Sequence, residues 1–314
     1  MNAFLVDIGG TWTRFRNGSN VERVATPSKL RHPHRASSAL ARELVLLLAE
    51  RVPTNTDAHV SLGAAYDPET DIAYGSGPLW GTGRHDIPFR RLLERQRPDV
   101  RWTVTNDVTA GLAHFTKVYA RSADRQVMYV TISSGIALRT AQLPSRRIHV
   151  NAEGLQGEVG HLPATSTAIE AVRGLTCECG GLGHIAAISA GPAIPHVAEK
   201  LGLDGYNQPR NSEDGAPTEL DERLLRVIVE PIANLIRTAV ALQPHIDLIG
   251  IGGGVPSGIG TRYKHELHRQ LSTAQSYVDR QPNGGPRLLL VSPDQVRPEN
   301  GAALMAQGYL ENVK

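Results

Sequence analysis

Short apolar runs alternate along the chain with amphipathic stretches, a pattern typical of α/β proteins. Strands are predicted where an apolar run ends at glycine or at polar residues. In the first half they are 4–8, 12–16, 21–24, 59–62 and 101–105, with an Asn17-Gly18 hairpin turn. In the second half they are 127–133, 247–251 and 288–291.

Helices are predicted where apolar residues recur at helical spacing. The first follows Ser37 or Ser38, the expected N-cap, and carries leucines at positions 40, 44, 47 and 48. The others are 89–95, 108–119, 186–200, 219–242 and 301–308. Residues 63–88 and 151–183 are predicted to be long irregular segments.

Two similar blocks of strands followed by helices predict two α/β lobes, with a hinge near Asn106. The first lobe is expected to span 1–106 and the second 107–297. A closing helix at 298–314 is expected to return to the first lobe.

The chain has 314 residues, with 33 Lys and Arg against 31 Asp and Glu, so its net charge is +2. This balance argues against a non-specific nucleic-acid binder. No apolar run approaches the roughly 20 residues needed to span a bilayer. The N-terminus lacks the basic and apolar regions of a signal peptide. Cys177 and Cys179 are too few for a disulfide framework, and a cytoplasmic protein is predicted.

Two glycine-rich turns are candidates for phosphate binding. Asp7-Ile8-Gly9-Gly10-Thr11 follows a strand, and Gly252-Gly253-Gly254 follows another in the second half. Glycine allows close approach to a phosphate, and exposed backbone N–H groups attract anions. Thr11 adds a hydroxyl donor, and Asp7 can hold the magnesium that accompanies a nucleotide. An ordinary hairpin turn is the alternative for the first motif. Glycine-rich loops are common in proteins, so the second motif has weight only because it matches the first one in the other half of the chain.

Asn106-Asp107 lies between a predicted strand and a helix, next to the expected hinge. A carboxylate at the floor of a cleft between lobes can accept a hydroxyl proton as that oxygen attacks phosphorus. The alternative is a helix cap, because Asn and Asp are preferred there.

A candidate metal site combines Gly157-Glu158-Val159-Gly160-His161 with the segment from Cys177 through Cys179 to His184. Two thiolates and two imidazoles match the tetrahedral preference of structural zinc. The alternative is a pair of ordinary cytoplasmic thiols.

Together these motifs make the chain similar to the ROK family of sugar kinases, repressors and open reading frames, within the actin/hexokinase superfamily. The resemblance is spread over most of the length, and the glutamate–histidine element with the zinc loop is its most specific part. Its motifs are Asp7-Ile8-Gly9-Gly10-Thr11, Asn106-Asp107, Gly154-x-x-Gly157-Glu158-Val159-Gly160-His161, Cys177-x-Cys179, Gly252-Gly253-Gly254 and Asn300-Gly301-Ala302-Ala303.

The resemblance implies a two-lobed, ribonuclease H-like α/β fold around a cleft, with ATP and Mg²⁺ as donor. It implies transfer of the γ-phosphoryl group to a sugar hydroxyl, with Asp107 as the general base. Asn106, Glu158 and His161 would form the substrate side. His161 would also bind zinc with Cys177 and Cys179, and His184 stands at the family's third cysteine. Ser134-Gly135, in Ser133-Ser134-Gly135-Ile136-Ala137, replaces the family's second phosphate loop.

Three departures from the family pattern concern the acceptor. The sugar-binding glutamate after the zinc loop is Ala186, Gly63-Ala64-Ala65-Tyr66 replaces a proline-glycine strand end, and Gly77-Pro78-Leu79-Trp80-Gly81 lacks an asparagine. We therefore expect a specialised kinase, of the kind found in antibiotic biosynthesis. Its expected target is the 6-hydroxyl of a hexose or aminohexose such as kanosamine or an N-acetylhexosamine.

Two alternatives stay open: a C7-cyclitol kinase, and a sugar-sensing protein that has lost catalysis. A repressor is not expected, because the first phosphate loop begins at Asp7 and leaves no room for a DNA-reading module. Polyphosphate as donor and a homodimer remain open.

Overall fold

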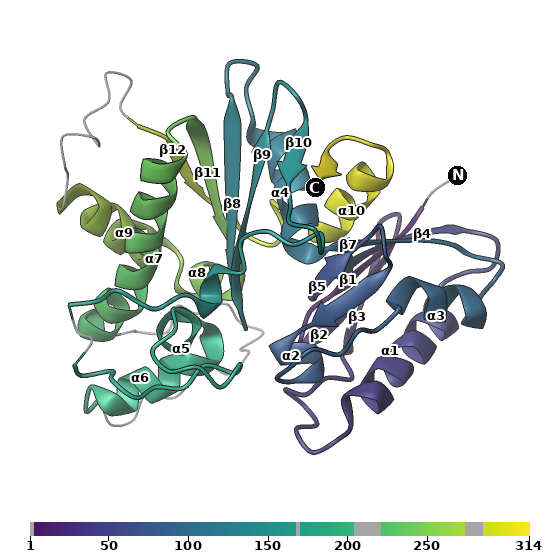
Figure 1. The fold of residues 1–314 in the computed structure, drawn as a ribbon, viewed down its shortest axis with the longest axis horizontal. Coiled ribbons are helices and arrows are strands. Elements are labelled where there is room, and N and C mark those ends of the chain that lie inside the picture. The colour runs from purple at the N-terminus through teal and green to yellow at the C-terminus, as the bar shows by residue number, and fades with distance from the viewer. Residues whose placement is uncertain (1–2, 168–169, 204–220, 274–284) are drawn as a thin grey trace. The chain divides into compact units, whose positions relative to one another are not determined.

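The computed structural model describes residues 3–167, 170–203, 221–273 and 285–314 (Figure 1). It divides into two compact units. Unit 1 comprises Met1–Ser122, Arg139–Gly157 and Val296–Lys314, and unit 2 comprises Ala123–Leu138 and Glu158–Gln295. Within the described part of the chain, no helix has the length and apolar character needed to cross a membrane.

Unit 1 contains a five-stranded sheet in the order β3-β2-β1-β4-β7. Its first three strands form an antiparallel meander, and β1, β4 and β7 run parallel. The bounds are β1 (Phe4–Ile8), β2 (Trp12–Asn17), β3 (Asn20–Ala25), β4 (Asp57–Leu62) and β7 (Arg101–Asn106). All five strands were predicted. The hairpin turn lies where Asn17-Gly18 indicated it, and Gly18 has a φ of +59° that glycine adopts without strain.

Helices cover both faces of this sheet. Side chains of α1 (Ser37–Arg51) and α3 (Phe89–Gln96) share one apolar core with alternate residues of the strands. On the other face α10 (Pro298–Ala306) packs against α4 (Asp107–Tyr119) and the parallel strands. The two helices approach so closely that a β-carbon on Gly301 would lie 1.7 Å from the carbonyl oxygen of Ala110. Glycine at 301 is therefore required by packing.

Two local predictions in unit 1 were wrong. Ala36, not a serine, is the N-cap of α1, and the Ser37 hydroxyl donates to the carbonyl of Trp80 instead. The segment 63–88 is not irregular throughout, because it contains the hairpin of β5 (Ala65–Asp67) and β6 (Ile72–Gly75) and the short helix α2 (Gly77–Trp80). These elements are too short for a periodic pattern to reveal them.

The second sheet has the order β12-β11-β8-β9-β10-β13. In unit 2, β8, β11 and β12 run parallel, and they match the predicted strands. The bounds are β8 (Gln126–Ile132), β9 (Ile136–Gln142), β10 (Arg147–His149), β11 (Ile246–Gly252), β12 (Arg287–Leu290) and β13 (Glu311–Val313). Strand β9 was missed because its first six residues are all buried, so it shows no alternation of apolar and polar positions.

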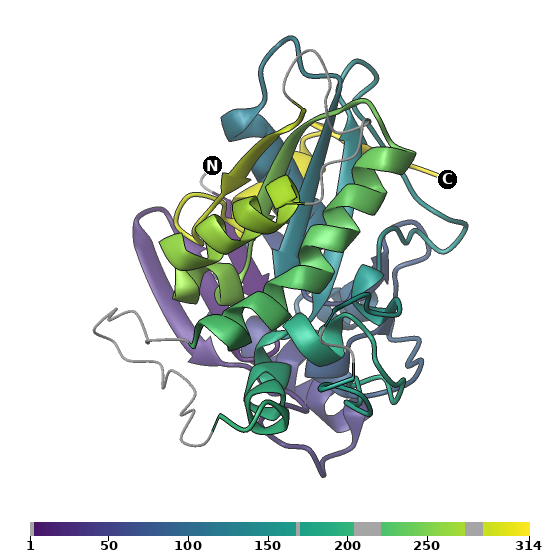
Figure 2. The ribbon, with the colours of Figure 1, turned by 90° about the vertical axis from the view of Figure 1, so that its left-hand side faces the viewer.

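The helices of unit 2 pack on its parallel strands around a second apolar core, with the long α7 lying across the sheet (Figure 2). Their bounds are α5 (Ala186–Ser189), α6 (Ile194–Lys200), α7 (Glu222–Leu242), α8 (Gly254–Ile259) and α9 (Thr261–Thr273), with 3₁₀ turns η1 (Val159–His161) and η2 (Gly191–Ala193). The predicted helix 186–200 is interrupted at Gly191-Pro192, and α9 was not predicted because few of its residues are buried. The predicted start of α7 at 219 lies outside the described residues.

The division into units differs from the predicted boundary at 106/107. Helix α4 and the segment Arg139–Gly157 belong to unit 1. The reason is packing, because α4 lies against α10 and β7, and β10 pairs with β13 near the C-terminus.

Candidate functional site

Three parallel strands of unit 1 end at the same edge of the sheet, and each is followed by a residue of interest. The register aligns Ile8 with Leu62 and Leu62 with Asn106, so Gly9, Gly63 and Asp107 come next in each strand. A β-carbon on Gly63 would lie 2.8 Å from the carbonyl oxygen of Ile8 and 3.6 Å from Asp107 Oδ2. The carboxylate of Asp107 therefore stands beside the turn that follows β1, where ligands of such sheets bind.

Asp7 is buried in the middle of this edge. It accepts hydrogen bonds from Ser61 Oγ at 2.9 Å and from Arg14 Nη1 at 2.8 Å. Burial and the nearby charge of Glu299 raise its pKa to about 6, despite the opposing effect of Arg14. A buried carboxylate held this way fits a divalent cation, whose positive charge would offset the desolvation. Sequence reasoning missed Ser61 and Arg14, although strand alternation places both on the face of Asp7.

The turn after β1 is a tight hairpin connection, as the alternative interpretation expected. The N–H of Gly9 donates to the carbonyl of Trp12 at 3.0 Å, so this donor is already used. Gly10 is needed for packing, because a β-carbon there would lie 2.4 Å from Cβ of Pro78. Thr11 is exposed and remains the polar side chain that this turn presents.

Asn106 is the N-cap of α4. Its Oδ1 accepts from the N–H groups of Val108 and Thr109, and its Nδ2 donates to the carbonyl of Ala64 at 2.8 Å. The cap predicted as the alternative role is confirmed. The same Nδ2 lies 3.2 Å from Asp107 Oδ1, so Asn106 also orients the neighbouring carboxylate.

In unit 2 the two predicted phosphate loops lie at the ends of neighbouring parallel strands, β8 and β11. Ser134 and Gly135 form the tight turn after β8, closed by the Ser133 N–H donating to the Gly135 carbonyl. Gly253 has a φ of +105°, and a β-carbon there would lie 2.3 Å from the carbonyl of Ile132. Gly252 and Gly254 flank it, at the end of β11 and the start of α8. The two loops thus lie side by side, and the close backbone contact at Gly253 leaves no room for a side chain there.

The four predicted zinc ligands, His161, Cys177, Cys179 and His184, converge in unit 2. One ligand atom from each lies within 4.8 Å of the others. Cys177 Sγ is 3.6 Å from His161 Nδ1, and Cys179 Sγ is 3.3 Å from His184 Nδ1. In tetrahedral zinc with usual bond lengths a sulfur and a nitrogen ligand lie about 3.5 Å apart. The donor set and its spacing therefore fit zinc.

Backbone hydrogen bonds build the loop that carries these ligands. The Cys177 N–H donates to the Gly181 carbonyl, and the Gly180 N–H donates back to the Cys177 carbonyl, each at 2.8 Å. On the other side, η1 sits directly on β9, because a β-carbon on Gly160 would lie 2.5 Å from the Ile136 carbonyl. Exposed Glu158 immediately precedes η1, and His161 ends it.

Ala186 begins α5 close to this element, since the N–H of Ile185 donates to the carbonyl of Leu162 at 2.9 Å. The position holds a methyl group where the resemblance expects a carboxylate. Unit 2 therefore offers Glu158 as the carboxylate of the predicted substrate side.

Comparison with known proteins gives three informative matches. A 2-epi-5-epi-valiolone 7-kinase of Actinoplanes sp. is 38% identical, covering 96% of this chain and 92% of its own. An N-acetylmannosamine kinase of Vibrio cholerae is 25% identical, covering 88% and 91%. A crystal structure of the ROK family glucokinase of Streptomyces griseus, with glucose and AMPPNP, superposes with a TM-score of 0.71. It covers 98% of this chain and 100% of that one at 16% identity, and confirms the predicted fold class.

The sequence profile of the ROK family matches residues 6–308, almost the whole chain. The motifs that suggested the family lie within these residues. The chain thus belongs to the ROK family and is a sugar kinase.

Proposed function

We propose that the protein is an ATP-dependent kinase that phosphorylates the exocyclic 7-hydroxyl of a C7 cyclitol related to 2-epi-5-epi-valiolone. The observation that carries this proposal is the 38% identity with a kinase of that name over nearly the full length of both chains. The C7 hydroxymethyl of such a cyclitol corresponds to the C6 hydroxymethyl of a hexose. The proposal therefore keeps the predicted transfer of a phosphoryl group from ATP to a hydroxymethyl group. It replaces the expected hexose acceptor by a C7 cyclitol, which was one of the two alternatives.

Ala186 supports this choice of acceptor. A ring ketone, as in a valiolone, offers only a hydrogen-bond acceptor, whereas a sugar hydroxyl also donates. A glutamate facing a ketone would place two hydrogen-bond acceptors, the carboxylate and the ketone oxygen, against each other in a closed pocket, which is costly. A methyl group at 186 avoids that conflict and removes a partner that glucose would use.

The reaction needs one proton acceptor, and Asp107 supplies it. The acceptor oxygen forms a bond to the γ-phosphorus as the bond between that phosphorus and the β–γ bridging oxygen breaks. The hydroxyl proton passes to the Asp107 carboxylate, and ADP leaves with the electron pair of the broken bond. Asn106 orients this carboxylate through its 3.2 Å contact with Oδ1. Glu158 is assigned to hydroxyls of the acceptor ring.

Magnesium and zinc have separate sets of residues. Asp7 would hold the magnesium that neutralises phosphate charge, and Thr11, Ser134, Gly135 and the glycines 252–254 would surround the phosphates. His161, Cys177, Cys179 and His184 would hold zinc, and the metal would then fix the loop that carries Glu158.

The test is a panel of acceptors with purified enzyme, Mg²⁺ and ATP. ADP release is measured for 2-epi-5-epi-valiolone, glucose, kanosamine and N-acetylmannosamine, and the phosphorylated position is assigned by ³¹P-coupled NMR. We expect kcat/KM for the cyclitol to exceed that of each sugar at least tenfold, or about 1.4 kcal/mol. Asp107→Asn enzyme serves as the control for contaminating kinases.

The relatives that are N-acetylmannosamine kinases favour a second candidate, a kinase for the 6-hydroxyl of an N-acetylhexosamine. A tenfold preference for any of the three sugars would replace the cyclitol proposal with this hexose class. Binding of an acceptor without ADP release would instead support the non-catalytic sensor.

A further inference from the structure

Three side chains form a row across one face of the unit 1 sheet. The strand register pairs Asp7 with Arg14 and Arg14 with Arg23. Arg14 donates to Asp7, so its charge is compensated. Arg14 and Arg23 are, however, directly opposite like charges on neighbouring strands, and such pairs destabilise a sheet.

A third arginine joins them around an indole ring next to the predicted phosphate turn. The guanidinium of Arg23 lies 3.9 Å from the centroid of Trp12, and that of Arg31 lies 4.7 Å from it. Arg31 Nε also donates to the carbonyl of Thr11 at 3.1 Å. Trp12 thus holds two guanidinium groups beside the turn that follows Asp7.

The positive charges of Arg23 and Arg31 are not balanced by carboxylates of the described residues. Within the described residues, no carboxylate lies at ion-pair distance from Arg23 or Arg31, whereas Arg16, on the same face, pairs with Glu299 at 3.1 Å. Burial and the charges of Arg14 and Arg31 lower the pKa of Arg23.

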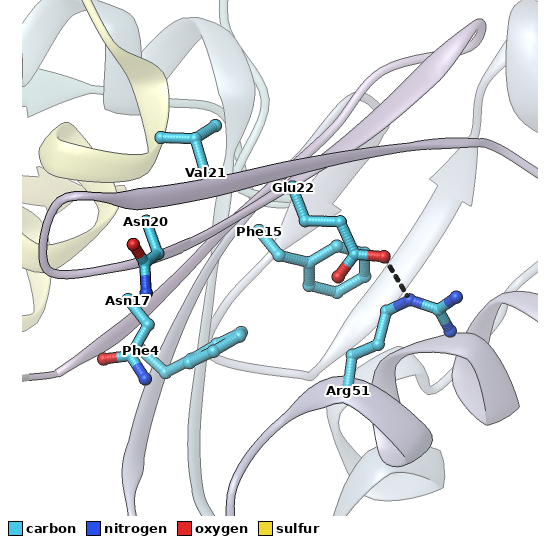
Figure 3. Close-up of a pocket in the computed structure, with 7 residues that line it drawn as sticks. All are labelled: Phe4, Phe15, Asn17, Asn20, Val21, Glu22 and Arg51. Carbon is cyan, nitrogen blue, oxygen red and sulfur yellow. Dashed lines mark hydrogen bonds and ion pairs between the residues drawn. The ribbon is translucent and has the colours of Figure 1, made fainter.

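The opposite face of the same hairpin shows the contrast. There Glu22 lies 3.1 Å from Arg51, at the edge of a pocket of about 350 Å³ that Phe4 and Phe15 line (Figure 3). Glu22 is thus paired on that face, and the excess of positive charge lies on the face of the hairpin that carries Arg14 and Arg23.

We propose that Arg14, Arg23 and Arg31, the arginine cluster around Trp12, bind the phosphoanhydride chain of the phosphoryl donor. The identity of the ligand as a donor rests on the proposed kinase function. Guanidinium groups pair with phosphate oxygens through two parallel hydrogen bonds, and a row of them matches a chain of linked phosphates. The contact between Arg31 and Thr11 joins the cluster to the predicted phosphate turn. ATP and inorganic polyphosphate share this chemistry.

The probe is inorganic tripolyphosphate, titrated calorimetrically into the full-length protein alongside ATP. The variants are Arg23→Gln and Arg31→Gln. The matched control is Arg101→Gln, on the opposite edge strand of the same sheet, where Arg101 pairs with Asp57. Each cluster variant should weaken tripolyphosphate binding about tenfold to a hundredfold, the effect of one lost charged hydrogen bond. The dependence of Kd on salt should also flatten, and Arg101→Gln should change neither.

A thermal readout separates binding from a structural role. Removing one member of the Arg14–Arg23 pair should leave the Tm of ligand-free Arg23→Gln protein equal to or above that of the wild type, because repulsion is relieved. A lower Tm with unchanged binding would overturn the proposal.

The binding results identify the source of the phosphates. Weaker binding of both ligands supports the cluster as the site for the ATP triphosphate. Weaker tripolyphosphate binding with unchanged ATP binding supports an inorganic chain as its ligand. Unchanged tripolyphosphate binding in both variants overturns the inference, whatever ATP does. Failure of the wild type to bind ATP would instead contradict the proposed function, so the two failures are distinguishable.

Discussion

Arg14 donates a 2.8 Å hydrogen bond to Asp7 across the β1–β2 pairing, yet the pKa of Asp7 is raised to about 6. Burial and Glu299 outweigh the favourable contact. The carboxyl of Asp7 has a pKa of about 4 in the unfolded chain. At higher pH the folded protein must therefore bury an ionised carboxylate whose surroundings favour the protonated form. This destabilisation is absent below pH 4 and complete once the pH has risen through 6.

Asp7→Asn should accordingly stabilise the protein while abolishing turnover. In EDTA without nucleotide, we expect the free energy of unfolding at pH 7.5 to rise by about 1–3 kcal/mol, with a smaller gain at pH 4. Urea denaturation at both pH values measures it.

Asp247→Asn is the control of opposite sign, because hydrogen bonds from Arg125 lower the pKa of Asp247. That variant should lose stability at pH 7.5 and less at low pH. A destabilised Asp7→Asn protein at pH 7.5 would contradict the burial argument.

Asp107→Asn should lower kcat by roughly 10²–10⁴, the contribution of a positioned general base. The fold should persist. The Val108 N–H donates to Asp107 Oδ1 at 2.9 Å, and the side-chain oxygen of an asparagine can accept the same hydrogen bond. Steady-state kinetics with a Tm measurement tests both statements. Turnover near that of the wild type would remove Asp107 from this role.

Asn106 should behave as a cap. Asn106→Ala leaves the N–H of Thr109 without its side-chain acceptor and the N–H of Val108 with Asp107 Oδ1 alone, and should cost about 1–2 kcal/mol of stability. Asn106→Asp keeps the acceptor oxygen but loses the donor to Ala64. If Asn106 acts by orienting Asp107, the aspartate variant should lower kcat more than it raises KM for the acceptor. The reverse pattern would favour direct contact with the acceptor.

The strand ends of the site could be predicted because glycines and carboxylates directly follow short apolar runs, as at Ile8 and Ile251. The arginine cluster could not, because it depends on the pairing of Arg14 with Arg23, and strand register is not visible in one sequence. Gly301 was identified as part of a motif, but its reason, contact with Ala110 across two helices, is a tertiary effect. Strand β9 was missed because it is buried on both faces.

We expect each chain to bind one zinc ion, and metal analysis of the purified protein measures this. Chelation should lower the Tm, because the ligands come from separate turns that the metal joins. His184→Cys should retain the ion, since thiolate and imidazole are both competent ligands, whereas His184→Ala should lose it. His149→Ala, exposed and outside the cluster, is the control. Metal-free protein with native Tm and activity would show that zinc has no structural role.

The last prediction concerns Ala186. Ala186→Glu restores a carboxylate beside the element that carries Glu158 and should shift the ratio of kcat/KM for cyclitol over glucose about tenfold towards glucose, or about 1.4 kcal/mol. The physical reason is donor and acceptor matching, because a carboxylate stabilises a hydroxyl and repels a ketone oxygen.

Ala186→Gln separates this effect from bulk. Glutamine has nearly the volume of glutamate, but its amide N–H can donate to a ketone. If hydrogen-bond character decides the acceptor, the glutamine variant should keep more activity on the cyclitol than the glutamate variant does. If both variants lose cyclitol activity equally while glucose does not gain, the methyl group at 186 acts only by leaving space. The choice of acceptor must then come from other residues around Glu158.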